Sequence, residues 1–125
     1  MTADTPDPKR DIEGRSYQFA LRVVRLCRKL DDVPGVRRTL GNQLIRSGTS
    51  VGANVEEAHA AASRADFTHK MNIALKEARE TRYWLRLLID AELVVPDEVR
   101  PLLGEATEVM RILGAIVATC RRSDS

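Results

Sequence analysis

Residues 46–70 read RSGTSVGANVEEAHAAASRADFTHK, a stretch with helical character at both ends and a middle of small and polar residues. The middle contains Gly48, Gly52, Ser47, Ser50 and Asn54. Glycine in a helix interior costs about 1 kcal/mol relative to alanine, and serine and asparagine prefer helix ends. A helix that tolerates these residues gains close contact with another helix. We therefore interpret this stretch as a packing surface, and we expect the contact to lie between subunits.

Apolar residues recur at helical spacing on both sides of this stretch. Two helices are predicted over about residues 11–30 and 36–62, separated by Pro34 and Gly35, which favour a turn. Ser63 and Asp66 resemble a capping box that starts a third helix, which runs to about residue 93. A fourth helix covers about residues 98–121, with Pro101 in its first turn or just ahead of it.

No sustained period-2 alternation indicates a strand, and the short connections make successive helices antiparallel neighbours. The sequence therefore predicts an all-α, up-down-up-down antiparallel four-helix bundle over residues 11–122, with a disordered lead-in at 1–10 and a disordered tail at 123–125. The residues expected to face its core are Ile12, Phe19, Val23, Leu26, Leu30, Leu40, Leu44, Ser47, Val51, Val55, Ala58, Phe67, Met71, Ala74, Ala78, Leu85, Leu88, Leu102, Ala106, Val109, Leu113, Ile116 and Cys120.

The composition is that of one ordinary soluble domain. The 125 residues are 43% hydrophobic and 30% charged, and no apolar run is long enough for a membrane span or a signal peptide. We therefore expect a cytoplasmic protein. Cys27 and Cys120 fall near opposite ends of the predicted bundle, on the order of 25 Å apart at 1.5 Å rise per residue. They are expected to be core thiols and not a disulfide.

Gly41, Gly48 and Gly52 form a bare stripe on the second helix, beside its stripe of large apolar residues. Such a helix has two packing surfaces, and we expect the bare one to dock against a neighbouring copy of the chain. The alternative is that it faces the third or fourth helix of its own bundle. Asn54 borders the two stripes and, if buried, is expected to tie two helices in register by hydrogen bonds.

The stretch at 46–59, followed by ADFTHKMNIALKEARETRYWLRLLIDAEL, resembles the four-helix-bundle family named after proteins encoded in intervening sequences of bacterial large-subunit ribosomal RNA genes. The likeness covers about residues 15–121. One departure is EEAHAAAS, where many members have a Glu-Gly turn, and it suggests a longer second helix. The residues that carry the likeness are Arg46, Ser47, Ser50, Val51, Ala53, Asn54, Val55, Glu57, Phe67, Ala74, Glu77 and Glu80.

This resemblance implies a homo-oligomer, a ring of five bundles. It also points to a related protein, the accessory variability determinant of diversity-generating retroelements, which is a basic barrel that engages a reverse transcriptase and nucleic acid. Members of the intervening-sequence family have no settled activity. The family name records where the genes lie and does not establish binding to ribosomal RNA.

Positive charge is concentrated in the first third of the chain. Residues 9–46 hold ten basic and four acidic side chains, a net charge of +6, whereas the whole chain carries +2. A face of the first helix and the following turn is the candidate nucleic-acid site, which without interleaved aromatic residues would bind shape and backbone. The alternatives are a solvated face or arginines that bridge to acidic groups on a neighbouring subunit. The candidate residues are Arg15, Arg22, Arg25, Lys29, Arg37 and Arg38.

The spacing of Glu56 with His59 and of Asp66 with His69 is that of di-iron bundles. Both pairs flank one turn at an end of the predicted bundle, so we expect surface side chains and no metal or other cofactor. Glu77 is expected to form a structural salt bridge with Arg46. The chain contains no phosphate loop, serine elbow or cysteine–histidine nucleophile pair.

We therefore predict a cytoplasmic, non-catalytic, oligomeric scaffold. Its partners are further copies of itself and structured RNA or a nucleic-acid-processing enzyme. The alternatives are a metal-dependent, di-iron-like bundle enzyme and an oligomer that binds only protein partners.

Overall fold

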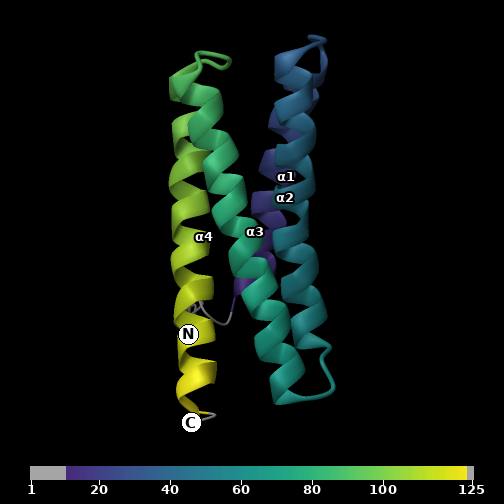
Figure 1. The fold of residues 1–125 in the computed structure, drawn as a ribbon, viewed down its shortest axis with the longest axis vertical. Coiled ribbons are helices and arrows are strands. Elements are labelled where there is room, and N and C mark those ends of the chain that lie inside the picture. Colours follow the sequence, from purple (N-terminus) through teal and green to yellow (C-terminus); the bar gives the residue numbers. More distant parts are fainter. Residues whose placement is uncertain (1–10, 124–125) are drawn as a thin grey trace, which may run out of the picture.

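The computed structural model describes residues 11–123, which form four helices and no strand. Successive helices run in opposite directions: the α1–α2 and α3–α4 turns lie at one end and the α2–α3 turn at the other (Figure 1). The predicted all-α, up-down-up-down bundle is confirmed. The predicted lead-in at 1–10 and residues 124–125 of the predicted tail lie outside the described residues. The helices are α1 (Ile12–Asp31), α2 (Val36–His59), α3 (Arg64–Asp90) and α4 (Pro96–Ser123).

Within residues 11–123, each helix packs against two neighbours and none packs against the helix diagonal to it. The order of contact is α1–α2–α3–α4 and back to α1, and the α1–α4 seam is by far the most sparsely packed of the four. The bundle therefore consists of three well-packed seams and one looser seam.

The core follows the predicted apolar faces along most of each helix. Phe19, Leu44, Met71 and Leu113 are examples of predicted core residues that are fully buried. In α4, however, Val117 is buried, and the predicted Ile116 and Cys120 are only partly so. A strict seven-residue repeat drifts relative to the 3.6 residues of a helical turn, and after Leu113 the buried stripe takes a step of four. Five predicted core residues are half-buried: Leu26, Leu40, Phe67, Ile116 and Cys120.

The ends of α3 explain where the chain turns. Ser63 caps its start as predicted, because its Oγ accepts a hydrogen bond from the Asp66 N–H at 3.1 Å. At its other end Glu92 adopts a left-handed φ of 59°. The Leu93 N–H then donates to the Leu88 carbonyl and the Glu92 N–H to that of Ile89, each at 3.0 Å. This is a Schellman motif, and it ends the helix before the predicted limit at residue 93.

Two other predicted helix limits are wrong by a few residues. α2 ends at His59 and not near Ala62, so the alanine-rich segment does not lengthen it. α4 begins at Pro96, where proline is favoured because the first helical N–H has no partner. Pro101 therefore lies in the second turn of α4 and not in the first. Within residues 11–123, no helix is both long enough and apolar enough to cross a membrane.

Candidate nucleic-acid interface

One surface of α1 carries four exposed cations, Arg22, Arg25, Arg28 and Lys29, which we call the basic face. They lie opposite the buried stripe that contains Phe19, since amphipathic spacing sends polar residues outward. No ion pair joins them to another described residue. A hollow of about 540 Å³ is lined by Arg25, Arg28, Lys29 and Asp32. A second hollow, of about 180 Å³, lies between α1 and α4 and is lined by Arg22, Arg25, Leu26, Lys29, Glu98 and Leu102.

Arg15 does not belong to this face, although it was predicted there. Its Nε donates to Oε2 of Glu105 at 2.8 Å and its Nη2 to Oε1 at 2.9 Å, so both carboxylate oxygens are engaged. This hydrogen bonding to Glu105 raises the pKa of Arg15, more than partial burial lowers it. The side chains are 30% and 19% exposed, and the pair links α1 to α4. Arg15 therefore has a structural partner within the chain.

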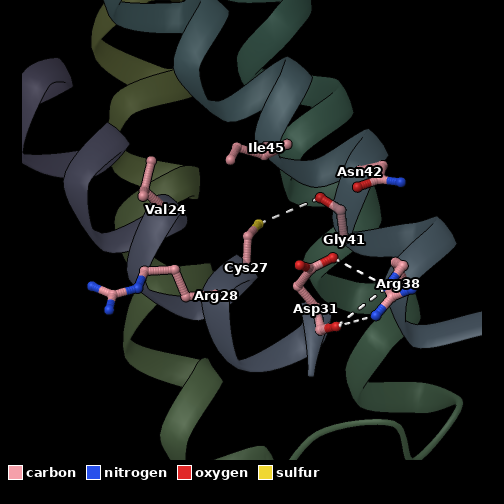
Figure 2. A pocket seen from close by; sticks show the side chains of 8 residues that line it. All are labelled: Val24, Cys27, Arg28, Asp31, Arg38, Gly41, Asn42 and Ile45. Carbon is pink, nitrogen blue, oxygen red and sulfur yellow. Dashed lines mark hydrogen bonds and ion pairs between the residues drawn. The ribbon is translucent and has the colours of Figure 1, made fainter. Parts of the chain in front are cut away.

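Arg38 also has a partner within the chain, and Arg37, like Arg38, lies on α2 and not on α1. Arg38 donates from Nε and Nη2 to the Asp31 main-chain oxygen at 3.2 and 2.8 Å, and its Nε lies 3.2 Å from the Asp31 carboxylate (Figure 2). It thereby satisfies a carbonyl at the end of α1. Arg37 is half-buried, and its buried Nε has no hydrogen-bond partner among the described residues. The prediction missed Arg28, although it lies one turn from Arg25; in Figure 2 its guanidinium points away from the α1–α2 seam.

The glycines of α2, which were predicted to dock a neighbouring copy of the chain, make close contacts within their own bundle. Gly48 faces Val23 of α1, and Gly52 faces the Ser16 carbonyl oxygen, 3.3 Å from where a Cβ would lie. Gly41 lies against Leu30. The stripe packs on α1, whereas the intramolecular alternative had named the third or fourth helix. A bare stripe specifies close approach, but it does not specify which helix approaches.

Asn54 does not tie two helices together. Its side-chain N–H donates to the Ser50 carbonyl of the same helix at 2.8 Å, and the side chain is only partly buried. A buried polar contact between helices lies elsewhere: Thr81 of α3 donates to Ser47 of α2, with 3.0 Å between the two hydroxyl oxygens. Ser47 was predicted to face the core, whereas Thr81 was not singled out, and the pairing of the two depends on the register of α2 against α3.

Two hollows follow one another along the outside of the α1–α2 seam, and together we call them the outer groove. One, of about 250 Å³, lies between Tyr17 and Ala20 of α1 and Gly52 and Ala53 of α2. The other, of about 240 Å³, is drawn in Figure 2, where Val24, Cys27, Gly41 and Ile45 lie around it. Tyr17 is 63% exposed beside the first hollow. Gly41 and Gly52 therefore line this groove as well as packing on α1.

The carboxylate–histidine pairs do not converge. Nδ1 of His59 lies 2.9 Å from the Val55 carbonyl and 2.9 Å from a Glu13 carboxylate oxygen, and its ring forms a T-shaped contact with the ring of Phe67. Glu56 and His69 are exposed, and Asp66 lies in the first turn of α3. Over residues 11–123, no three His, Cys, Asp or Glu side chains are grouped so that they could hold a metal ion.

The predicted Arg46–Glu77 salt bridge is confirmed, with 3.4 Å between Nη1 and Oε2. Arg46 also pairs with Glu80, which accepts a hydrogen bond from the Trp84 indole N–H at 3.0 Å. These residues connect α2 with α3 and contain no nucleophile, so they form a structural network.

Comparison with known proteins agrees with this architecture. The family model described as 23S rRNA-intervening sequence protein matches residues 9–115. The chain is also similar to a solved crystal structure, that of a protein with unknown function from the S23 ribosomal protein family of Bacteroides thetaiotaomicron VPI-5482. The two are 42% identical, with 85% of this chain and 97% of that chain covered and a TM-score of 0.78. None of the curated proteins compared with the chain matches it.

Proposed function

We propose, since this chain belongs to the family of 23S rRNA-intervening sequence proteins, that it acts in the cytoplasm as a non-catalytic, oligomeric scaffold that binds structured RNA. The basic face of α1 is the binding surface. A nucleic-acid-processing enzyme bound at the same surface is the alternative partner.

The observation that carries the proposal is the unpaired state of the basic face. Arg22, Arg25, Arg28 and Lys29 are exposed within about two helical turns, whereas Arg15 on the same helix is held by a carboxylate. Exposed cations without protein partners can replace the counterions of phosphate groups. No aromatic side chain lies among the four, so binding follows the shape and backbone of the RNA and not its bases.

The oligomer forms through the outer groove in this proposal. Tyr17 projects beside small residues, Ala20 and Ala53, which allow a neighbouring copy to approach closely. Exposed tyrosine is favoured at interfaces because it has a large apolar surface and a polar end. Repetition around a ring of five subunits would join the basic faces into a belt.

The RNA proposal is tested with the double variant Arg22→Glu/Arg25→Glu, whose binding to a short RNA hairpin is followed by fluorescence anisotropy over a range of salt concentrations. The matched control is Lys76→Glu/Arg79→Glu, which reverses two exposed cations at the same spacing on α3. We expect wild-type affinity to fall steeply with salt and the α1 variant to bind at least roughly tenfold more weakly with a shallower salt slope. Equal losses in both variants, or no salt-dependent binding by the wild type, would overturn the proposal.

The assembly is tested by light scattering coupled to size exclusion. We expect the wild type to be larger than a monomer and Tyr17→Glu to reduce its mass. Tyr83→Glu is the control, because Tyr83 is similarly exposed, at 55%, but lies on α3. A monomeric wild type would remove the ring from the proposal, whereas an intact ring that binds no RNA would favour a scaffold for protein partners.

A further inference from the structure

A hollow of about 360 Å³ lies between the last turns of α3 and the first turns of α4, and three arginines line it: Arg82, Arg86 and Arg100. It shares no residue with the basic face of α1. We propose that this hollow is a binding site for a phosphate group. The inference is independent of the RNA-binding proposal, since the two surfaces use different side chains.

Most hydrogen-bond donors of these arginines are free. Nε of Arg82 donates to the Thr107 hydroxyl at 3.3 Å, and Nη1 of Arg100 donates to Asp97 at 2.7 Å. Arg86 forms no hydrogen bond or ion pair with any residue that the structure describes. A guanidinium group carries five N–H donors, so the three side chains retain the majority of theirs for a ligand.

The hollow differs from the other places where arginine reaches a neighbouring helix. Arg15 meets Glu105, and Arg46 meets Glu77 and Glu80. Across the α3–α4 seam, by contrast, the group that faces Arg82 is the neutral Thr107 hydroxyl.

The lining of the hollow therefore keeps an excess of positive charge. Asp90 is the one acidic residue of the lining, and Asp97 outside it pairs with Arg100, so three arginines are set against two carboxylates. Ile89, Leu103 and Thr107 make up the rest of the lining, and the apolar side chains beside the arginines lower the local dielectric constant and so strengthen the attraction for an anion. A bound anion would also relieve the mutual repulsion of the three guanidinium groups.

The donor arrangement favours phosphate over carboxylate. A guanidinium fork binds two oxygens of a phosphate or carboxylate side by side. A carboxylate has only two oxygens and is satisfied by one such fork. A phosphate presents three or four oxygens in different directions, which suits forks that arrive from two helices. Thr107 helps to position the site, since its hydroxyl holds Arg82 and itself donates to the Leu103 carbonyl at 3.1 Å.

The test is titration calorimetry of the full chain in phosphate-free buffer, with pyrophosphate and adenosine monophosphate as probes. We expect saturable binding by the wild type and a loss of at least roughly tenfold in affinity for Arg86→Gln/Arg100→Gln. Lys76→Gln/Arg79→Gln removes two exposed cations outside the hollow and is expected to bind as the wild type does. Unchanged circular dichroism and an unchanged melting temperature without probe show that each variant is folded.

The results also distinguish the source of the phosphate. If the hollow variant loses pyrophosphate but keeps its affinity for the RNA hairpin, the site serves a small phosphorylated molecule. If it loses both while the control loses neither, the phosphate belongs to a nucleic-acid backbone. Equal affinities in the hollow and control variants, or a wild type that does not bind pyrophosphate, would contradict the site whatever the RNA result.

Discussion

Arg15 and Glu105 lie 90 residues apart in the chain and form a bidentate ion pair across the α1–α4 seam, with N–O distances of 2.8 and 2.9 Å. This seam is the sparsest in the bundle, so a polar contact that crosses it has an unusually large share in holding the two helices together. Because of this pair, Arg15 is not available to the candidate nucleic-acid site, for which it had been predicted.

Breaking this pair is predicted to destabilise the fold. We expect Glu105→Gln to lower the free energy of unfolding by about 1–2 kcal/mol, because the Arg15 guanidinium keeps its half-buried position and loses its charged partner. A double-mutant cycle with Arg15→Gln, measured by urea denaturation, should give a coupling energy of about 1 kcal/mol. The control cycle uses Arg111 and Glu108, an exposed pair three residues apart, for which about 0.3 kcal/mol is expected. Equal coupling in the two cycles would show that the α1–α4 pair is no more than a surface contact.

Gly48 and Gly104 are predicted to respond in opposite directions to alanine. A Cβ at Gly48 would lie 2.7 and 2.9 Å from the two methyl carbons of Val23, a stiff side chain that is itself fully buried. We expect Gly48→Ala to cost about 1–3 kcal/mol despite its better helix propensity. A Cβ at Gly104 meets nothing within 4 Å, so Gly104→Ala should gain about 0.5–1 kcal/mol. Thermal unfolding of both variants tests the contrast, and a stabilised Gly48→Ala variant would refute the tight α1–α2 contact.

Glu92 is predicted to be a site where glycine stabilises the protein. Its φ of 59° is costly for a side chain with a Cβ, yet the Schellman motif at the end of α3 requires it. We expect Glu92→Gly to raise the free energy of unfolding by about 0.5–1 kcal/mol. Ala91→Gly is the control: the φ of Ala91 is −82°, so glycine gives no relief there and should be neutral or destabilising. A loss of stability in Glu92→Gly would count against the left-handed turn.

The two thiols are predicted to react at very different rates. Cys27 is 6% exposed, its Sγ donates to the Gly41 carbonyl at 3.4 Å, and burial raises its pKa to about 12. Thiolate is the reactive form, so Ellman's reagent at about pH 8 should modify the partly exposed Cys120 and reach Cys27 only after unfolding. The Cys120→Ser variant should lack the fast phase. Rapid modification of both thiols in native protein would show that Cys27 is open to solvent.

The same thiol gives a pH dependence with a definite sign. Below about pH 9, the ordinary pKa of a cysteine, Cys27 is protonated in both the folded and the unfolded chain, and its contribution to the free energy of unfolding is fully present. Between about pH 9 and pH 12 the unfolded chain releases this proton and the folded chain keeps it. Stability should therefore fall as the pH rises through this range, and the fall should be smaller in Cys27→Val. An identical pH dependence in the two proteins would contradict the burial of the thiol.

The predictable part of the fold is the part set by short-range pattern. Apolar spacing predicted the existence and order of the helices, and the spacing of Ser63 to Asp66 predicted the start of α3. The end of α3 could not be foreseen, because Glu92 stands where a glycine would have signalled the left-handed turn. Predicted helix limits are wrong where the residue that usually marks a helix end is absent.

The candidate site was predictable to a smaller extent, because it depends on how helices are placed against one another. Helical spacing placed Arg22, Arg25 and Lys29 on an outward surface, and the same spacing would have included Arg28. It could not show that Glu105 would reach Arg15, nor that Gly48 would meet Val23. Both facts depend on the register and rotation of α1 against its neighbours, which no single helix encodes.

The sparse α1–α4 seam affects where the bundle opens locally. With fewer contacts to break, separation of α1 from α4 is expected to cost less than separation at the other three seams, and amide exchange should be faster along that edge than along the others. The hollow formed by Arg22, Arg25, Lys29, Glu98 and Leu102 exists only while the two helices stay together. If a polyanion binds there as proposed, it selects the closed form, so occupancy by the ligand and suppression of this opening would be thermodynamically linked.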